Sequence, residues 1–488
     1  MKMLSELLNM LPASLNIPDV TVSGVKLDSR QVANGDLFIA IPGYETDGRA
    51  YIDAAIDQGA VAVIAESPGL AVEQRRGAVV IGFSGVREHL SEIAGNFFEH
   101  PSKGMTVIGV TGTNGKTSVT HIIAQLAQRL GKESAVIGTT GSGLIGRLLP
   151  ERHTTPDAVT IQQRLATLKA EGAELVAMEV SSHALVQRRV DALQFAAVAI
   201  TNISRDHLDY HGTMDNYVAA KQRLFTDFGV QHRIVNADDA VLANWYKEHG
   251  AELWVTLNDA SLEPSLKASG LQFHEEGSAF ELSWQGQSYA IETPLLGRFN
   301  IYNVLTAIAT LLSLGYKLSG LANACKQLMP VPGRMEAFHN QHSPLVVVDY
   351  AHTPDALDQV LRALRLHCKG KLWCVFGCGG DRDRGKRPQM GKVAADSADV
   401  VVVTDDNPRT EPSEQIIDDI LAGIAEKDKV KVWPGRREAV IRAMQEAQQD
   451  DVVLLAGKGH EDYQVIGTQR VDYNERAVVS DWLQGDCA

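Results

Sequence analysis

The stretch Gly109-Val-Thr-Gly-Thr-Asn-Gly-Lys-Thr117 follows an apolar run, residues 105–110, and precedes a helical pattern. This order predicts a strand, a glycine-rich loop and a helix, in which backbone N–H groups and the helix N-terminus face phosphate oxygens. Lys116 would reach the β- and γ-phosphates, and Thr117 would offer its hydroxyl to Mg²⁺. The strict G-x-x-x-x-G-K-[ST] pattern fails at its first glycine, where Val110 stands, and a plain glycine-rich turn is the alternative. We favour a variant nucleotide-binding loop.

Length and charge limit the classes of protein to consider. The chain has 488 residues, which is too long for one hydrophobic core, so we expect two to four domains. It has 46 basic and 60 acidic residues, a net charge of -14, which argues against a general binder of nucleic acids or anionic membranes. No run of 18 apolar residues and no secretory h-region occurs, so a soluble cytoplasmic protein is expected.

The cysteines do not form a metal-binding pattern. They are odd in number, scattered, and without paired C-x-x-C spacing. Cys374 is expected on a buried strand and Cys378 in the loop after it. The five cysteines are Cys325, Cys368, Cys374, Cys378 and Cys487.

Residues 1–100 read as a small α/β unit. Short apolar runs at 36–41, 60–64 and 78–81 alternate with helical patterns such as 51–58. The polar turn Leu27-Asp-Ser-Arg30 and a second polar loop at 42–48 interrupt them. Turn-forming Asp and Ser residues are common for structural reasons, so their pattern alone assigns no function.

A second α/β unit begins near residue 100. Its strands alternate with helices, which implies right-handed crossovers and a largely parallel sheet that binds ligands at the carboxyl ends of its strands. The motifs Glu179-Val-Ser-Ser-His183 and Asn202-Ile-Ser-Arg-Asp-His207 each follow such a strand, so they should share one sheet edge with the phosphate loop. The expected strands are 105–110, 134–138, 175–179, 195–202 and 233–236.

A third α/β unit follows a β-rich segment at 272–293 and an apolar helix that runs from Gly297 to about residue 314. The breaker cluster Pro330-Val-Pro-Gly-Arg334 marks the boundary. Most loops after its strands carry charged residues beside glycine or proline, which suggests a second ligand-binding edge. The expected strands are 345–349, 372–376, 400–404, 430–433 and 452–456.

Four residues invite both a functional and a structural interpretation. Glu179 could hold Mg²⁺ or cap the next helix, and His207 could be a metal ligand or a hydrogen-bonded loop histidine. From its spacing, Lys221 looks like a solvated helix lysine. Arg409 could clamp a carboxylate with two hydrogen bonds or be a surface arginine. A basic cluster one loop away favours the clamp; it comprises Arg382, Arg384, Lys386 and Arg387.

Taken in order, the motifs resemble the Mur ligase family over nearly the whole chain. The resemblance implies an α/β protein of three domains: a small N-terminal α/β domain (1–100), a central P-loop domain with a mostly parallel sheet (101–333) and a C-terminal Rossmann-like domain (334–488). The motifs are Thr111-Gly-Thr-Asn-Gly-Lys-Thr117, Glu179-Val-Ser-Ser-His183, Ser204-Arg-Asp-His-Leu-Asp-Tyr-His211, Ala220-Lys221, Gly297-Arg-Phe-Asn-Ile-Tyr-Asn303, Gly333-Arg-Met-Glu336, Asp349-Tyr-Ala-His-Thr-Pro-Asp355, Asp406-Asn-Pro-Arg409 and Gly457-Lys-Gly-His-Glu461.

The resemblance also implies an activity. It points to ATP-dependent ligation of meso-2,6-diaminopimelate to the D-glutamate of UDP-N-acetylmuramoyl-L-alanyl-D-glutamate, through an acyl phosphate, in peptidoglycan biosynthesis. The implied cofactor is Mg²⁺, held partly by a carbamylated Lys221. The implied partners are these small molecules and ATP, with no nucleic acid or membrane, and the protein is expected to be a monomer.

The resemblance also implies roles for individual residues. Lys116, Lys221 and His207 would act in catalysis, and the binding residues fall into four groups. The metal ligands would be Thr117, Glu179, His207 and Lys221. ATP would contact Gly112, Thr113, Asn114, Gly115, Lys116, Thr117, Ser118, Asn300, Asn303, Arg334, Asp349 and His352. The UDP-linked substrate would contact Leu27, Ser29, Tyr44, Glu45, Thr46, His153, Thr154, Thr155, Ser181, Gln187 and Arg189. Diaminopimelate would contact Arg382, Asp406, Asn407, Pro408, Arg409, Gly457 and Glu461.

Other functions remain possible from the sequence. A related ligase that adds lysine or D-Ala-D-Ala, or a folylpolyglutamate synthase, would share the phosphate loop, although Asp406-Asn-Pro-Arg409 and Leu27-Asp-Ser-Arg30 speak against it. A nucleotide-switch protein that hydrolyses ATP without ligating anything is a different class. The distal carboxylate of diaminopimelate is absent from lysine, so Arg409 favours the former. His153 stands where the family commonly has asparagine.

Overall fold

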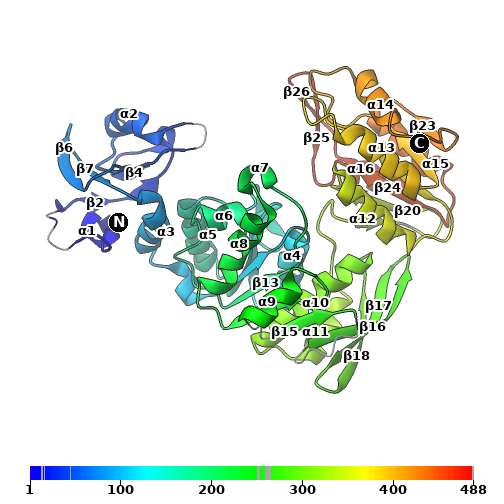
Figure 1. Cartoon of the computed structure of the whole chain (residues 1–488), viewed down its shortest axis with the longest axis horizontal. Helices are drawn as coiled ribbons and strands as arrows, with labels where there is room; N and C mark the ends of the chain where they lie inside the picture. The colour runs from blue at the N-terminus through cyan, green and yellow to red at the C-terminus, as the bar shows by residue number, and fades with distance from the viewer. Residues whose placement is uncertain (13–14, 16, 44–45, 250–252, 259–264, 486–488) are drawn as a thin grey trace. The chain divides into compact units, whose positions relative to one another are not determined.

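The computed structural model (Figure 1) divides into two compact units. One comprises Met1–Trp254 with Thr306–Tyr316, and the other comprises Val255–Leu305 with Lys317–Ala488. This division differs from the expected boundaries near 100 and 333, so those boundaries stay a proposal. The structure describes residues 1–12, 15, 17–43, 46–249, 253–258 and 265–485.

The first α/β segment of the chain has the sheet order β3-β4-β5-β7-β6, parallel except for β6. Side chains alternate along β4: Leu37 and Ile39 join one core, while Phe38 joins the other. Helices therefore cover both faces of this sheet, and the prediction of a small α/β unit is confirmed. The elements are β1 (Lys2–Met3), α1 (Leu4–Leu7), β2 (Thr21–Val22), β3 (Gly24–Lys26), η1 (Ser29–Gln31), β4 (Asp36–Ala40), η2 (Gly48–Tyr51), α2 (Ile52–Asp57), β5 (Ala62–Glu66), β6 (Ala71–Arg75), β7 (Ala78–Phe83) and α3 (Val86–Phe97).

The second segment places β8, the strand before the phosphate loop, between β12 and β13. The strands β9, β12, β8, β13 and β14 are parallel neighbours, and β10 and β11 extend the sheet in antiparallel fashion. The phosphate loop therefore leaves the middle of the sheet, with polar loops on both sides. The elements are η3 (Pro101–Gly104), β8 (Thr106–Thr111), α4 (Lys116–Arg129), β9 (Ser134–Gly138), β10 (Gly141–Leu144), β11 (Arg147–Leu149), α5 (Ala158–Ala170), β12 (Leu175–Glu179), α6 (Ser182–Val186), β13 (Ala197–Ile200), α7 (Leu208–His211), α8 (Met214–Thr226), β14 (His232–Asn236), α9 (Leu242–His249) and β15 (Leu253–Thr256).

The β-rich segment is an antiparallel meander, and the helix expected after Gly297 spans Arg298–Ser313. Both predictions are confirmed. The elements of this part are β16 (Ser265–His274), β17 (Gly277–Trp284), β18 (Gln287–Thr293), α10 (Arg298–Ser313) and α11 (Leu318–Cys325).

The last segment is a sheet with the order β19-β20-β24-β21-β22-β23, parallel except for β19. Val347 lies in a core with α12, α13 and α14, whereas Val346 and Val348 face α15 and α16. This sheet is doubly wound, as expected. The elements are β19 (Glu336–Phe338), β20 (Leu345–Asp349), α12 (Pro354–Arg365), β21 (Leu372–Phe376), α13 (Lys386–Ser397), β22 (Val400–Val403), α14 (Ser413–Leu421), β23 (Val430–Val432), α15 (Arg436–Glu446), β24 (Val452–Ala456), β25 (Tyr463–Ile466), β26 (Gln469–Asp472) and α16 (Glu475–Gln484).

Two smaller predictions concern cysteines and membranes. Cys374 is buried on β21 and Cys378 is buried just after it, as predicted. Burial raises the pKa of the Cys378 thiol to about 12, so it is an unreactive side chain. Within the described ranges, no helix combines the length and hydropathy needed to span a bilayer.

Candidate active site

The phosphate loop has the backbone that phosphate binding needs. Gly112 has φ +141° and Gly115 has φ +86°, which glycine adopts without strain. A Cβ atom at Gly112 would lie 2.0 Å from Thr201 Oγ1, so no larger residue fits there. Lys116 Nζ donates to the carbonyls of Gly112 and Thr113, both at 2.9 Å. The lysine thus lies over its own loop, where a phosphate would meet it.

Glu179 lies beside this loop, as the strand order predicted. Thr117 Oγ1 donates to Glu179 Oε1 at 3.0 Å, and Thr139 N donates to the same oxygen at 2.8 Å. Glu179 is 1% exposed, and a Cβ atom at Gly138 would lie 2.2 Å from its Oε1. The helix-capping alternative is wrong, because Ser181 caps the following helix α6.

Lys221 is not the solvated helix lysine that its spacing suggested. It is 1% exposed, and its Nζ donates to Gly112 O of the phosphate loop at 2.8 Å. The ammonium also lies 4.6 Å from the centre of the Tyr217 ring. Burial, with a smaller contribution from Lys116, lowers the pKa of Lys221 well below its usual value. The structure therefore places beside the phosphate loop an amine whose burial disfavours its charged form.

His207 precedes the short helix α7 with φ +52°, a conformation that few non-glycine residues adopt. Its ring packs edge-on against that of His183, with centroids 4.8 Å apart. Burial and the neighbouring His207 lower the pKa of His183 to about 4, so His183 is neutral near pH 7. His183 therefore adds no positive charge beside His207, whose Nε2 lies 3.4 Å from Asp206 Oδ2.

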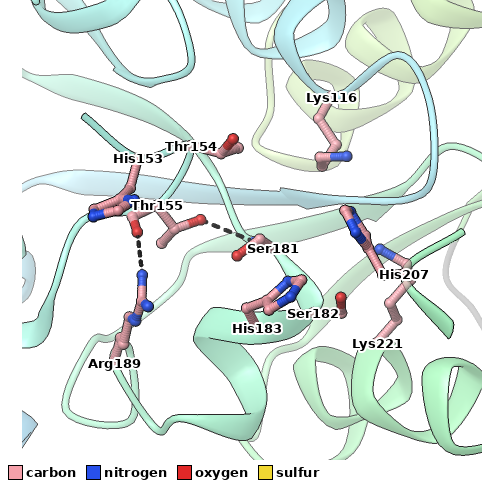
Figure 2. A pocket seen from close by; sticks show the side chains of 10 residues that line it. All are labelled: Lys116, His153, Thr154, Thr155, Ser181, Ser182, His183, Arg189, His207 and Lys221. Atoms are coloured by element: carbon pink, nitrogen blue, oxygen red, sulfur yellow. Dashed lines mark hydrogen bonds between the residues drawn. The ribbon is translucent and has the colours of Figure 1, made fainter. Parts of the chain in front are cut away.

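Four of these side chains line one pocket of about 290 Å³, together with six other residues. The four are Lys116, His183, His207 and Lys221. Figure 2 shows the lining residues in two groups, with Lys116, His207 and Lys221 on one side and His153 and Arg189 on the other. The pocket thus joins the phosphate loop to the residues expected to hold the UDP-linked substrate. Its lining residues are Lys116, His153, Thr154, Thr155, Ser181, Ser182, His183, Arg189, His207 and Lys221.

Hydrogen bonds fix the substrate side of this pocket. Thr155 Oγ1 donates to Glu179 O at 2.8 Å and accepts from Ser181 N at 3.0 Å. Arg189 Nη1 donates to Thr155 O at 2.7 Å, and its Nε and Nη2 donate to Gln187 Oε1. Five predicted residues therefore form one connected network, which comprises Thr155, Glu179, Ser181, Gln187 and Arg189.

The N-terminal candidates are less connected. Leu27 and Ser29 are partly buried at the start of η1, and Thr46 is exposed. Asp28, between the first two, caps η1 and pairs with Arg30, so this turn has a clear structural role. Tyr44 and Glu45 lie outside the described residues.

Residues predicted for the nucleotide also occur in the second unit. Asn303 Nδ2 donates to Asn300 Oδ1 at 2.8 Å on α10, and both are buried. Asp349 accepts from the backbone N–H groups of Met335 and Ala351. Arg334 and His352 are close enough to Asp349 to oppose the rise in its pKa that burial causes. The two asparagines form one local cluster, and Asp349 forms another with Arg334 and His352.

The residues expected to bind diaminopimelate converge at the carboxyl ends of β22 and β24. Arg409 has φ +52°, and its Nη1 donates to Gly380 O at 2.9 Å. This hydrogen bond fixes the orientation of the guanidinium group. Asn407 Nδ2 donates to Glu461 Oε2 at 3.1 Å. Asp406, Asn407 and Pro408 are buried, and Gly457 has φ +112°. Arg382 is exposed in the neighbouring loop.

Most of the basic cluster beside this site has a structural role. The cluster was expected to favour Arg409 as a carboxylate clamp, and this expectation about the cluster is wrong. Arg387 is fully buried and pairs with Glu411 at 3.0 Å and Asp419 at 2.8 Å. Arg384 pairs with the same Glu411 at 2.9 Å. Because Glu411 and Asp419 lie far along the chain, the local sequence could not reveal these pairs.

The sequence interpretation gave no role to Ser182, His183 or Lys458, although all three lie in quoted motifs. Ser182 and His183 line the pocket. Lys458 is fully buried and donates to Glu461 Oε2 at 2.7 Å. A lysine flanked by two glycines after a buried strand was the available signal for Lys458.

Thr117 and Glu179 fit Mg²⁺, which prefers hydroxyl and carboxylate oxygens. Among the residues that the structure describes, no group of three His, Cys, Asp or Glu side chains is spaced to bind a metal. A Mg²⁺ held by few protein oxygens and by substrate phosphates agrees with this arrangement.

The chain matches three family models along its length. They are described as Mur ligase family, catalytic domain (residues 21–98), Mur ligase middle domain (110–311) and Mur ligase, glutamate ligase domain (333–459).

Individual proteins agree with these matches. The chain is 50% identical over 480 residues to the UDP-N-acetylmuramoyl-L-alanyl-D-glutamate--2,6-diaminopimelate ligase of Vibrio vulnificus (strain YJ016), covering 96% of this chain and 97% of that protein. A solved structure of a ligase with the same name is 36% identical, with a TM-score of 0.75, covering 100% and 99% of the two chains. The MurF ligase from Thermotoga maritima in complex with ADP shares the fold at 18% identity, with a TM-score of 0.63, covering 95% and 98%. The chain therefore belongs to the Mur ligase family.

Proposed function

We propose that this chain ligates meso-2,6-diaminopimelate to the D-glutamate carboxyl group of UDP-N-acetylmuramoyl-L-alanyl-D-glutamate, with ATP as the energy source, in peptidoglycan synthesis. The observation that carries the proposal is the pocket that joins Lys116 of the phosphate loop to Arg189 and Thr155. Such a pocket would bring a γ-phosphate and a substrate carboxylate together. The substrates follow from the near full-length relative at 50% identity, whose name specifies them.

In the first step, a carboxylate oxygen of the D-glutamate attacks the γ-phosphorus, and the bond to the β-phosphate oxygen breaks to release ADP. Lys116 now donates to two carbonyls of its own loop, and it would exchange them for phosphate oxygens. Its charge would stabilise the negative charge that develops in transfer. The amine of diaminopimelate then attacks the carbonyl carbon of the acyl phosphate and forms a tetrahedral intermediate. The amide forms when the C–O bond to phosphate breaks and the nitrogen loses a proton to water.

Thr117, Glu179 and His207 would hold Mg²⁺, which when bound neutralises phosphate charge. Lys221 would take part as a carbamate (N6-carboxylysine), formed when its neutral amine adds to CO₂ and loses a proton. Burial favours that neutral amine, and Gly112 O at 2.8 Å places it beside the phosphate loop. Intact-mass measurement in bicarbonate should detect one added CO₂, and a Lys221→Arg variant should lack it.

The activity test omits one substrate at a time. ADP release should require the UDP-linked dipeptide and diaminopimelate together. ADP release that needs neither would favour the nucleotide-switch alternative. Starting from ¹⁸O-labelled D-glutamate carboxylate, one label should appear in the released phosphate; unlabelled phosphate would rule out the acyl phosphate. We further propose that the protein acts in the cytoplasm as a monomer, which light scattering at working concentration would check.

A further inference from the structure

Lys458 is a buried cation, in the loop after β24, to which the proposed chemistry gives no role. Its side chain has 0% exposure, and its Nζ donates to Asn407 Oδ1 at 3.0 Å and to Glu461 Oε2 at 2.7 Å. Asp406 Oδ1 lies 3.8 Å from the same nitrogen. An ammonium has three donors, and burial requires that they find acceptors. The two acceptors, and the more distant Asp406, all belong to residues predicted to bind the amino-acid substrate.

The lysine connects two loops that leave the sheet from separate strands. The strand β21 lies between β22 and β24, so the loops after β22 and β24 are not neighbours along the sheet. Asn407 Oδ1 accepts from Lys458 and from Val465 N at 2.9 Å, while its Nδ2 donates to Glu461. These contacts fix the orientation of the Asn407 amide. Arg409 contacts the same residue through the backbone, because its Nη1 donates to the backbone carbonyl of Asn407 at 3.4 Å.

Two carboxylate oxygens remain for a ligand. Glu461 accepts both of its hydrogen bonds at Oε2, and no described residue donates to its Oε1. Asp406 is 9% exposed, and its Oδ1 is buried without a hydrogen-bond partner in the described part of the chain. Buried polar atoms normally have partners, so an orphaned acceptor in a substrate loop points to a ligand donor.

The charges of this site match a zwitterion. Among the buried or half-buried residues predicted to bind the amino acid, Asp406 and Glu461 are acidic and Arg409 is basic, and Lys458 adds a second basic side chain. Arg382 is exposed in the neighbouring loop, where solvent screens its charge, so it is left out of this balance. The distal end of diaminopimelate carries one ammonium and one carboxylate, so a site of zero net charge complements it. Without Lys458, the site would have one excess negative charge. That site would favour a substrate whose distal end carries only an ammonium, as lysine does.

We propose that Lys458 positions Glu461, Asn407 and Arg409 for the distal end of the amino acid and sets the preference for diaminopimelate over lysine. The proposal rests on the proposed function, since it concerns the substrate of that reaction. Lys458 acts through its neighbours, which makes it a positioning residue.

The test compares a neutral variant with a charged one. In Lys458→Met, the KM for diaminopimelate should rise by about tenfold or more, equivalent to about 1.4 kcal/mol, while the KM for ATP stays within about twofold. The ratio of kcat/KM for lysine to that for diaminopimelate should also rise. The matched control is Lys431→Met, which removes a lysine that pairs with Glu446 at 2.5 Å outside these loops. It should leave all three parameters unchanged.

Lys458→Arg keeps the charge but replaces a compact ammonium with a planar fork, so it decides the matter even where the methionine variant does not fold. It should raise the KM for diaminopimelate, leave that for ATP unchanged, and keep the wild-type discrimination against lysine. A shift toward lysine in this variant would overturn the charge argument, and a wild-type KM for diaminopimelate would overturn the positioning argument. If the wild-type protein releases no ADP with diaminopimelate, the proposed function itself fails.

Discussion

Replacing Arg409 with glycine is expected to weaken diaminopimelate binding without weakening the fold. Arg409 has φ +52°, and a left-handed conformation costs a non-glycine residue about 1 kcal/mol, which glycine would not pay. The change also removes the hydrogen bond from Nη1 to Gly380 O at 2.9 Å, worth about 1 kcal/mol. The two effects nearly cancel, so the free energy of unfolding should change by less than about 1 kcal/mol.

The binding of diaminopimelate should change far more than the free energy of unfolding. Charge-assisted hydrogen bonds from a guanidinium to a carboxylate contribute about 1.5–3 kcal/mol, so the KM for diaminopimelate should rise about 10- to 150-fold. Steady-state ADP release, titrated separately with diaminopimelate and ATP, measures both KM values, and urea unfolding measures stability. The matched control is Gln285→Gly, since Gln285 has φ +47° in the exposed turn between β17 and β18. Equal increases in both KM values for Arg409→Gly would refute the clamp.

Three further predictions concern buried ionisable side chains. Lys221→Ala should reduce kcat by about 100-fold or more, as loss of a group that stabilises transition-state charge does, with partial rescue by bicarbonate; near-wild-type kcat would remove the carbamate from the mechanism. Arg436→Met should lower the free energy of unfolding by about 3–5 kcal/mol, because it leaves Glu475 buried without its partner at 2.5 Å; urea unfolding that shows no loss would contradict this. Burial lowers the pKa of His121 to about 4, below its unfolded value, so the unfolded chain binds a proton first and stability should fall by up to about 3 kcal/mol as the pH drops from about 6.5 to 4. His121→Gln should flatten that dependence in urea unfolding between these pH values, and an unchanged slope would contradict it.

The strands and the sheet edge could be predicted from local pattern. Apolar runs predicted the strands Leu175–Glu179 and Leu345–Asp349 with their observed bounds. The prediction worked because each is a short strand buried on both faces, so all of its residues are apolar or end the run. Parallel topology then brought Glu179 Oε1 to within 3.0 Å of Thr117 Oγ1, residues 62 positions apart, since Glu179 ends β12 and Thr117 follows the neighbouring strand β8. This part of the site follows from sheet geometry alone.

Buried cations could not be predicted in this way. Lys221 is buried because α8 packs where the lysine meets a carbonyl of the phosphate loop, 109 residues away. Arg387 is buried because carboxylates at 411 and 419 reach it. Helical spacing shows which residues share a face, but it does not show what that face meets. The interpretation of Lys221 as a ligand came only from resemblance to a family.

The central claim is the choice of amino acid, and a competition experiment tests it most directly. The protein is given ATP, Mg²⁺ and UDP-N-acetylmuramoyl-L-alanyl-D-glutamate with equal concentrations of meso-diaminopimelate and L-lysine, and the products are identified by mass spectrometry. The account predicts the diaminopimelate tripeptide in large excess, because Arg409 has a distal carboxylate to bind in that substrate alone. A product that contains lysine in equal or greater amount would contradict it.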